Sequence, residues 1–498
     1  MKLRIENTST KVARATDEEA DWLYAFLSFE DDKAEARRRA GYHVGDDRVR
    51  MFDRRRYTFP TGLLPIVIEG AGKKHIPLHI EDGREPAEPA RFRPREEMEA
   101  WPWNMKAEWS FQYEALCAAY MGGLPKPEPS RVHLDGRGIV KSPTGSGKGN
   151  IAAALAYAIE GRWLFVVHRG HLADDVRTRW NEMAGACGEP EAGFIGDGEW
   201  TVGERLTCAT LQTLHAAKKR GDPRYHDLAK LVTGLIIDEC HTAPAKSFYR
   251  TIQGMKRARY RIGLSGTPLD RGDRRSLLAI AAIGPLIYSI KARDLIDAGV
   301  LAEPHITVIP VAQRASERAR GDWHRTYNEL VVESAHRNGA LLAAMERALK
   351  DGDTPGMVFV RRIPHGQELA NLARKRGLNV AYVDGSKDTS QRRKAVEDLG
   401  NGRLDFVVAT KVFTEGVNVP ELRCVINGAG GKSVIEALQQ VGRGTRTTST
   451  KTSFRVYEIG DKGERMLHDH ARERLRAYRR EGYAVGVDRE IWPERAGT

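Results

Sequence analysis

One short segment of the chain carries the residue types that bind a phosphate group. The sequence Ser142-Pro-Thr-Gly-Ser-Gly-Lys148 follows a short apolar run and opens the helix-like stretch 149–160. Glycines let such a loop curl close to an anion, and its N–H groups and the helix N-terminus point at phosphate oxygens. A glycine-rich turn before a helix is the alternative, but the strand–loop–helix setting favours a nucleotide site. The predicted contacts come from Thr144, Gly145, Ser146, Gly147, Lys148 and Gly149.

The last of these residues departs from the usual pattern. A Ser or Thr after the lysine normally places its hydroxyl on Mg²⁺, whereas this chain has Gly149. We expect a water molecule to take the place of that hydroxyl, or other carboxylates to hold the metal ion more strongly.

An acidic pair, Asp238 and Glu239, ends the apolar run 234–237. Ligands of parallel sheets bind at the carboxyl ends of the strands. We expect Asp238 to hold Mg²⁺ and Glu239 to orient and deprotonate an attacking water molecule. An ordinary strand-end pair that caps a turn is the alternative, and the phosphate loop upstream favours catalysis.

Short apolar runs alternate with helix-like segments over most of the chain, which is typical of βα units around a buried parallel sheet. Two consecutive series predict an α/β fold with two tandem parallel-sheet domains, at residues 103–304 and 305–498. Residues 1–95 carry dense arginine and short alternating stretches. They predict a small α+β accessory domain, which we expect to bind nucleic acid, followed by a linker rich in proline and charge.

The amino-acid composition indicates which kind of binding partner and which cellular compartment to expect. A net charge of +12 over 498 residues suits a polyanionic partner. The five cysteines are scattered without a CxxC pair, which argues against a zinc site or a disulfide framework. No apolar run is long enough to cross a bilayer. We therefore expect no membrane partner and a cytoplasmic location, in a bacterial cell or a phage-infected host.

The motifs, taken in order, resemble those of superfamily 2 helicases. They are SPTGSGKG at 142–149, DECH at 238–241, LSGTP at 264–268, VVATKVFTEGVNVP at 407–420 and QQVGRGTR at 439–446. The resemblance implies that both parallel-sheet domains are RecA-like. It also implies that the cofactors are ATP and Mg²⁺, and that hydrolysis drives movement on nucleic acid.

The resemblance also implies roles for individual residues. Gln112 matches a glutamine that reads adenine, and Gly416 and Asn418 lie in the motif that contacts the nucleotide. Gln439, Arg443 and Arg446 match the catalytic residues of the last motif, and the spacing of the two arginines predicts that they share one helix face. The resemblance implies that His241, Ser265 and Thr267 couple the nucleotide state to the bound strand. It also implies that the nucleic-acid backbone is contacted by Arg169, Thr210, Gln212 and Thr410.

The stretch 264–306 and the pair Arg337-Asn338 resemble the XPB-like and UvsW-like DNA helicases in particular. That subgroup implies an ATP-dependent DNA helicase or translocase. It would remodel branched or forked DNA in recombination, repair or replication, with single-stranded or branched duplex DNA as the partner and RNA less favoured. Three alternatives stay open: the motor subunit of a restriction or defence complex, an RNA helicase, and a binding module whose ATPase is inactive.

Overall fold

The computed structural model describes most of the chain. The described residues are 1–30, 38, 41, 43, 48–85, 89–98, 107–122, 134–240, 246–267, 276–387, 389–410, 419–488 and 490. The chain divides into two compact units, which are Met1–Ser142 with Gly147–Ser289, and Ile290–Thr498 with Pro143–Ser146. The three predicted domain boundaries stay predictions.

The N-terminal part of the first unit is a small α+β fold. Its four-stranded sheet has the order β5-β2-β1-β6, and it includes both antiparallel and parallel pairs. A separate two-stranded ribbon pairs β3 with β4. The elements are β1 (Lys2–Ile5), β2 (Ser9–Arg14), α1 (Asp17–Phe26), β3 (Ser28–Glu30), β4 (Arg48–Arg50), β5 (Thr58–Pro60), α3 (Leu64–Lys73) and β6 (His79–Asp82).

The stretch 58–70, which belongs to the alternating part of the N-terminal sequence, forms a short strand and most of a helix. After β5 the chain turns into α3, in which Leu64, Val67 and Ala71 are buried. These positions are three and four residues apart, so they lie on one helix face, and Leu64 and Val67 pack into the core of this part. The spacing of the apolar residues, which suits a helix, therefore decides the structure of this stretch, although its β-branched residues favour a strand.

The N-terminal part shares its core with the sheet domain that follows it. Leu134 and Ala281 from that domain pack in the same cluster as Leu3 and Phe59. The guanidinium of the fully buried Arg137 donates to the main-chain oxygen of Asn7. The two parts are consequently joined by buried contacts within one compact unit.

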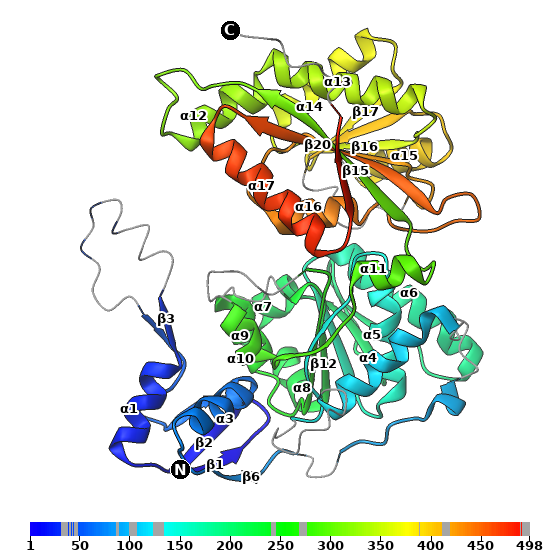
Figure 1. The fold of residues 1–498 in the computed structure, drawn as a ribbon. Helices are drawn as coiled ribbons and strands as arrows, with labels where there is room; N and C mark the ends of the chain where they lie inside the picture. Colours follow the sequence, from blue (N-terminus) through cyan, green and yellow to red (C-terminus); the bar gives the residue numbers. More distant parts are fainter. Residues whose placement is uncertain are drawn as a thin grey trace. The chain divides into compact units, whose positions relative to one another are not determined.

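An eight-stranded sheet forms the rest of the first unit, in the order β10-β9-β11-β8-β12-β13-β7-β14. The pairs are parallel apart from the β9–β10 hairpin, and helices cover both faces (Figure 1). The strands are β7 (Arg137–Lys141), β8 (Trp163–Val167), β9 (Gly193–Gly196), β10 (Glu199–Trp200), β11 (Leu206–Thr210), β12 (Gly234–Ile237), β13 (Tyr260–Ser265) and β14 (Leu286–Ser289). The helices are α4 (Ser110–Met121), α5 (Lys148–Ala158), α6 (Gly170–Cys187), α7 (Leu211–Arg220), α8 (Pro223–Leu231), α9 (Lys246–Gln253) and α10 (Ser276–Ala282).

The second unit holds a seven-stranded, wholly parallel sheet in the order β17-β18-β16-β19-β20-β15-β21. Its strands are β15 (Glu303–Ala312), β16 (Gly356–Phe359), β17 (Val380–Val383), β18 (Phe406–Ala409), β19 (Cys424–Asn427), β20 (Ser453–Lys462) and β21 (Ala484–Val487). Its helices are α11 (Ala292–Asp297), α12 (Trp323–Tyr327), α13 (Ala335–Lys350), α14 (Ile363–Lys375), α15 (Thr389–Gly400), α16 (Val434–Val441) and α17 (Arg465–Arg480).

Burial on both faces explains why these strands read as continuous apolar runs. Met357 and Val407 belong to the cluster on one face of the second sheet. Their neighbours Val358 and Val408 belong to the cluster on the other face. Successive side chains of a strand point to opposite faces, so each needs an apolar residue when helices cover both. The predicted α/β fold with two parallel-sheet domains and a small α+β domain is confirmed.

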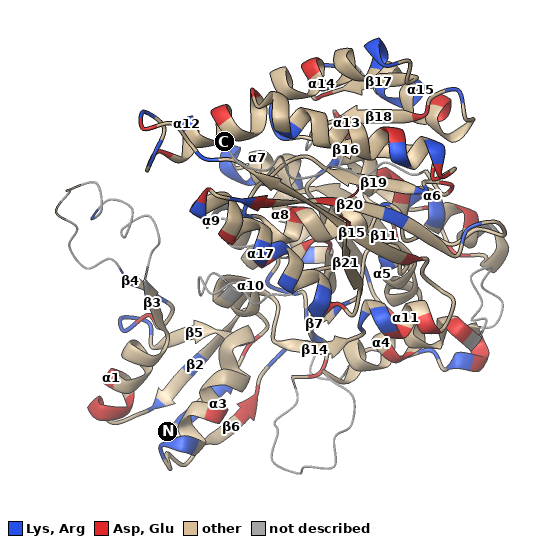
Figure 2. Cartoon of the chain, turned by 45° about the horizontal axis from the view of Figure 1, so that its top comes forward, with Lys and Arg blue, Asp and Glu red and all other residues tan. Residues whose placement is uncertain are grey.

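The arginine-rich segment 465–480 forms the helix α17. The other arginines of this helix are exposed and give it a basic surface (Figure 2), but Arg474 is fully buried. Its Nε and Nη2 donate to Glu458 Oε1 at 3.0 and 2.8 Å. This buried pair ties α17 to β20. None of the helices among the described residues combines the length and apolar character needed to cross a lipid bilayer.

Candidate functional site

Three neighbouring strand ends of the first sheet bring the predicted motifs together. β13 pairs with β12 on one side and with β7 on the other. The phosphate loop follows β7, the acidic pair follows β12, and the LSGTP segment ends β13 between them. Ser142 N donates to Ser265 O at 3.0 Å, which joins the loop to the LSGTP segment. The sheet order therefore gathers three motifs that lie far apart in sequence.

The phosphate loop has the backbone that its glycines predict. Gly145 and Gly147 have φ of +93° and +78°, in the region that favours glycine. Ser146 Oγ donates to Pro143 O at 2.7 Å, which closes the turn. α5 then begins at Lys148, so its N-terminal N–H groups face the loop. This is the geometry that binds phosphate oxygens.

Gln112 lies beside this loop. Its side chain is buried on α4, and a Cβ added at Gly147 would lie 2.7 Å from Gln112 Nε2. The same Cβ would lie 3.4 Å from the ring of Trp109. A side chain at position 147 would therefore displace the glutamine. The predicted adenine-reading residue and the phosphate loop are thus in direct contact.

The acidic pair meets the lysine of the loop. Lys148 Nζ lies 4.0 Å from Glu239 Oε1, with the side chains 10% and 20% exposed. Asp238 N donates to Val166 O at 3.0 Å, and Glu239 N donates to Asp238 Oδ1 at 2.9 Å. Glu239 has φ +46°, which is uncommon for a residue with a side chain and typical of strained functional positions.

This set of groups fits a nucleotide and a divalent cation. The curled loop and the start of α5 supply N–H donors, and Lys148 supplies positive charge. The carboxylate of Asp238 supplies oxygens of the kind that Mg²⁺ prefers. Each predicted role therefore has a group in a suitable place, and the roles themselves stay predictions.

Position 149 has room for a larger residue. A Cβ there would lie 3.5 Å from Val176 Cγ2 and 3.8 Å from Arg179 Cδ, which are ordinary contacts. The φ of Gly149 lies outside the left-handed region. Neither backbone conformation nor close packing of a Cβ accounts for the glycine.

In the LSGTP segment the two predicted coupling hydroxyls contact each other. Ser265 and Thr267 are both buried. Ser265 Oγ accepts from Thr267 N at 3.3 Å and lies 3.5 Å from Thr267 Oγ1. The segment is therefore a closed turn between the loop and the acidic pair.

The predicted nucleic-acid contacts follow strand ends in both units. Arg169 precedes α6 and is partly buried, and its carbonyl accepts from Leu172 N at 3.1 Å. Thr210 is buried with its Oγ1 2.8 Å from Thr213 Oγ1, whereas Gln212 is exposed. In the second unit, Thr410 is buried after β18, and its N donates to Val383 O at 3.2 Å. Gln212 is thus the most accessible of these four candidates.

The last motif differs from its predicted shape. Gln439 is buried on α16, but this helix ends at Val441. Arg443 lies in the following turn, and Arg446 forms a bridge with Leu301. The expectation that both arginines share one helix face is wrong.

The packing of Gly444 accounts for this early end of α16. A Cβ at Gly444 would lie 2.3 Å from the ring of Phe454, whereas the C-cap Gly442 keeps helical dihedral angles. The chain leaves the helix after Val441, so three-residue spacing no longer sets a common face.

Three candidate residues lie outside the described residues. They are His241, Gly416 and Asn418.

Comparison with known proteins agrees with this geometry. The family described as type III restriction enzyme, res subunit, matches residues 103–270. The helicase conserved C-terminal domain matches residues 340–448. The ATP-dependent DNA helicase uvsW of Enterobacteria phage T4 is 26% identical over 462 residues, which cover 88% of this chain and 86% of that protein.

The chain belongs to the superfamily 2 helicases.

A second relative of this helicase is the DNA 3′-5′ translocase XPB2 of Sulfurisphaera tokodaii. It is 27% identical, over 62% of this chain and 74% of that protein. The structure of S. cerevisiae Dbp5 bound to RNA and ADP BeF3 has a TM-score of 0.52 at 13% identity. It covers 80% of this chain and 94% of that one, and it shows the shared fold. Two further relatives, from a Sulfolobus islandicus filamentous virus and Halobacterium salinarum, are longer, and this chain spans 61% and 55% of their length.

Sequence reasoning missed a lysine that supports the last motif of this helicase. Lys451 is buried, and its Nζ donates to the carbonyl oxygens of Pro420, Leu422 and Gly444 at 2.6, 3.0 and 2.9 Å. Burial lowers the pKa of Lys451 to about 8. Its ammonium therefore connects two segments, the turn that contains Arg443 and the segment that precedes β19. Nothing in its local sequence, which is rich in threonine, signals this role.

Proposed function

We propose that this helicase is an ATP-dependent motor that moves on or remodels DNA, with branched or forked DNA as its substrate. The observation that carries the proposal is the meeting of Lys148, Glu239 and Gln112 at the carboxyl ends of the first sheet. The names of two relatives, a DNA helicase and a DNA translocase, favour DNA over RNA.

The residues of the first unit suggest how hydrolysis proceeds. The loop amides and Lys148 would hold and orient the phosphates, and Asp238 would hold Mg²⁺, which when bound would neutralise charge on the transferring group. Glu239 lies where it can accept a proton from the attacking water molecule. Gln439, Arg443 and Arg446 are proposed to stabilise the transferring phosphoryl group, as arginine fingers do in related reactions.

The protein is proposed to hold the DNA strand through contacts to its backbone phosphates. A motor that steps along arbitrary sequence must contact the backbone rather than base edges. Arg169, Thr210, Gln212 and Thr410 are the candidates, and Gln212 is the exposed one.

Steady-state ATP turnover with different nucleic acids tests the proposal. We expect weak turnover by the protein alone and strong stimulation by forked or four-way DNA, with less by single-stranded DNA and least by RNA. A rate that none of these nucleic acids changes would contradict a motor function. Stronger stimulation by RNA than by any DNA would instead support an RNA helicase.

A motor subunit of a restriction or defence complex is the second candidate. It is favoured by the name of the family that matches residues 103–270. Purification of the chain from its native cell would distinguish the two. A stable complex with a nuclease subunit would support this candidate, and a chain that acts on forked DNA by itself would support the first.

A further inference from the structure

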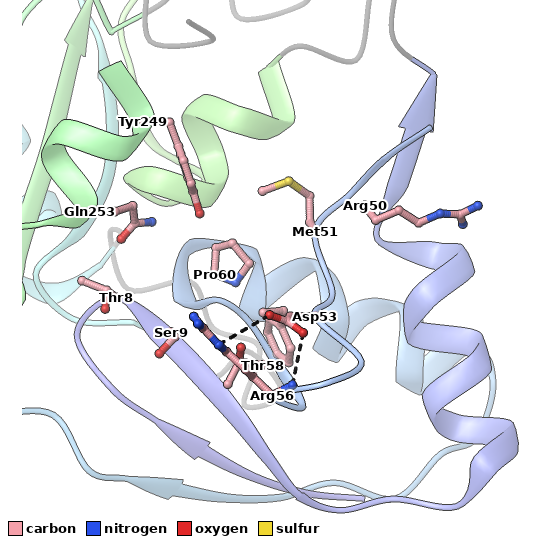
Figure 3. A pocket seen from close by; sticks show the side chains of 11 residues that line it. Thr8, Ser9, Arg50, Met51, Asp53, Arg56, Thr58, Pro60, Tyr249 and Gln253 are labelled. Atoms are coloured by element: carbon pink, nitrogen blue, oxygen red, sulfur yellow. Dashed lines mark hydrogen bonds and ion pairs between the residues drawn. The ribbon is translucent and has the colours of Figure 1, made fainter. Parts of the chain in front are cut away.

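A pocket lies between the N-terminal α+β part and α9 of the first unit (Figure 3). Its volume is about 410 Å³, which is enough for one nucleotide unit of a strand. Tyr249 and Gln253 reach into it from α9, opposite Ser9 and Arg56 of the N-terminal part. This pocket is separate from the candidate ATP site, and none of its lining residues belongs to a helicase motif.

Gln253 is the first sign that the pocket takes a ligand. Both polar atoms of its amide are shielded from solvent, and the Tyr249 hydroxyl beside them is its hydrogen-bonding neighbour. An amide offers two N–H donors and a carbonyl acceptor, so one neighbour leaves capacity for a water molecule or a ligand. The hydroxyl groups of Thr8, Ser9 and Tyr249 line the same space. The pocket therefore offers several donors to a ligand with oxygen acceptors.

The electrostatic surroundings favour an anion. Arg56 is 83% exposed at its side chain, and its Nε lies 3.9 Å from Asp53 Oδ2, which is a weak pairing. Behind Tyr249 lie two fully buried arginines, Arg137 and Arg261, whose charges act on the tyrosine. Within the residues that the structure describes, both guanidiniums bond to main-chain carbonyl oxygens and to no carboxylate.

Neither of these two guanidiniums has an acidic partner among the described residues. Burial lowers the pKa of Arg261 to about 10, so this side chain still carries its charge at neutral pH. An unpaired charge in a low-dielectric interior is unfavourable, and a nearby anion offsets part of that cost. Guanidinium, hydroxyl and amide donors together match the oxygens of a phosphate group.

We propose that this pocket binds a phosphate group of the DNA strand on which the motor acts. The proposal rests on the proposed function, because the ligand is a segment of the same nucleic acid. The N-terminal part and α9 would then bind the strand together through one defined phosphate-binding pocket, rather than through arginines scattered over the surface.

Binding of a fluorescent single-stranded oligonucleotide to the full chain tests the proposal. Arg56→Ala and Gln253→Glu should each weaken binding by about tenfold, because one loses a charged donor and the other places a carboxylate against the phosphate. Asp53→Asn should tighten binding, since it removes the acid beside Arg56. Arg14→Ala is the matched control, because Arg14 is an exposed arginine of the same part that does not line the pocket.

Loss of one phosphate contact should also lower the slope of log affinity against log salt by about 0.7 for Arg56→Ala. Thermal melting of each variant should match that of the wild type. The Asp53→Asn variant keeps the proposal testable if Gln253→Glu folds poorly, because it predicts a gain of affinity.

The outcomes separate the two proposals. Wild-type affinity in both Arg56→Ala and Gln253→Glu, or an equal loss in Arg14→Ala, would overturn the pocket proposal and leave the motor function standing. Variants that lose binding of inorganic phosphate or a 5′-mononucleotide but keep the oligonucleotide would show that the pocket takes a free ligand instead. A wild-type chain that binds no oligonucleotide would overturn the proposed function together with the pocket proposal.

Discussion

The Nζ atom of Lys148 lies 4.0 Å from Oε1 of Glu239, so the phosphate loop and the acidic pair meet across two neighbouring pairs of strands. This approach positions a cation for the phosphates beside a carboxylate for the attacking water. Three residues of the first unit and three of the second give predictions that separate catalysis, positioning and stability.

Lys148→Ala and Glu239→Gln should each abolish ATP turnover, because the first loses the charge on the phosphates and the second loses the proton acceptor. DNA binding should survive, since the proposed grip uses other residues. ATPase rates and oligonucleotide affinities measure the two effects. Lys230→Ala is the control, because this exposed lysine of the same unit pairs with Asp227 on the surface. Normal turnover in either Lys148→Ala or Glu239→Gln would overturn the site assignment.

Arg446→Ala should lower turnover far more than nucleotide affinity. In related sites an arginine finger increases the rate of hydrolysis by about 10³–10⁵-fold. Single-turnover hydrolysis and binding of a fluorescent nucleotide separate the two quantities. Arg455→Ala serves as the matched variant, since Arg455 is a half-exposed arginine of the same unit that pairs with Asp353. A variant that loses nucleotide affinity yet keeps full turnover at saturating ATP would contradict the role.

Lys451→Met should reduce turnover at saturating ATP while KM for ATP changes little. The methionine keeps the apolar stem but leaves three carbonyl oxygens without their donor, so the turn before Arg446 loosens. We also expect a loss of about 3 kcal/mol or more in the free energy of unfolding. Lys350→Met, at an exposed position on α13, controls for the loss of a lysine. Equal kinetics in both variants would remove Lys451 from any positioning role.

Local patterns in the sequence predicted the parts of the site that one segment builds. The glycines at 145 and 147 and the acids at 238 and 239 follow strands, and the parallel topology alone brings their ends together. The turn at Arg443 was not predictable from spacing, because close packing of Gly444 on Phe454 ends the helical path. Lys451, Arg137 and Gln253 became visible only with the fold, since their partners or neighbours come from distant segments.

His365 should make the stability of the second unit depend on pH. Burial lowers its pKa to about 3, and its Nε2 lies 2.9 Å from Asn338 Oδ1. The folded chain keeps this imidazole neutral, whereas the unfolded chain binds a proton below its ordinary pKa of about 6.5. The free energy of unfolding should therefore fall as pH drops from about 6.5 toward 3, by at most about 1.4 kcal/mol per pH unit from this group.

Denaturant unfolding at several pH values measures that dependence. His365→Gln keeps a donor for Asn338 and removes the titration, so its stability should vary less over this range. His324→Gln is the control, because His324 is exposed in the same unit. Identical pH profiles for wild type and His365→Gln would contradict the prediction.

Gly149 allows the contribution of a missing metal ligand to be measured. A Cβ at this position meets Val176 and Arg179 at ordinary contact distances, so Gly149→Ala and Gly149→Thr should both fold. Alanine should stabilise α5 by about 0.5–1 kcal/mol, because it replaces glycine in a helix. Threonine adds the hydroxyl that usually binds Mg²⁺.

Titration of Mg²⁺ against ATPase rate then separates the hydroxyl from the added Cβ. If a water molecule stands in for the hydroxyl, Gly149→Thr should reach half-maximal rate at a lower Mg²⁺ concentration, while Gly149→Ala should follow the wild type. The maximal rates should stay similar, since Mg²⁺ readily keeps its waters. Lower turnover in both variants at every Mg²⁺ concentration would show that the site needs the glycine itself. Superimposable curves for all three proteins would show that position 149 contributes nothing to metal binding.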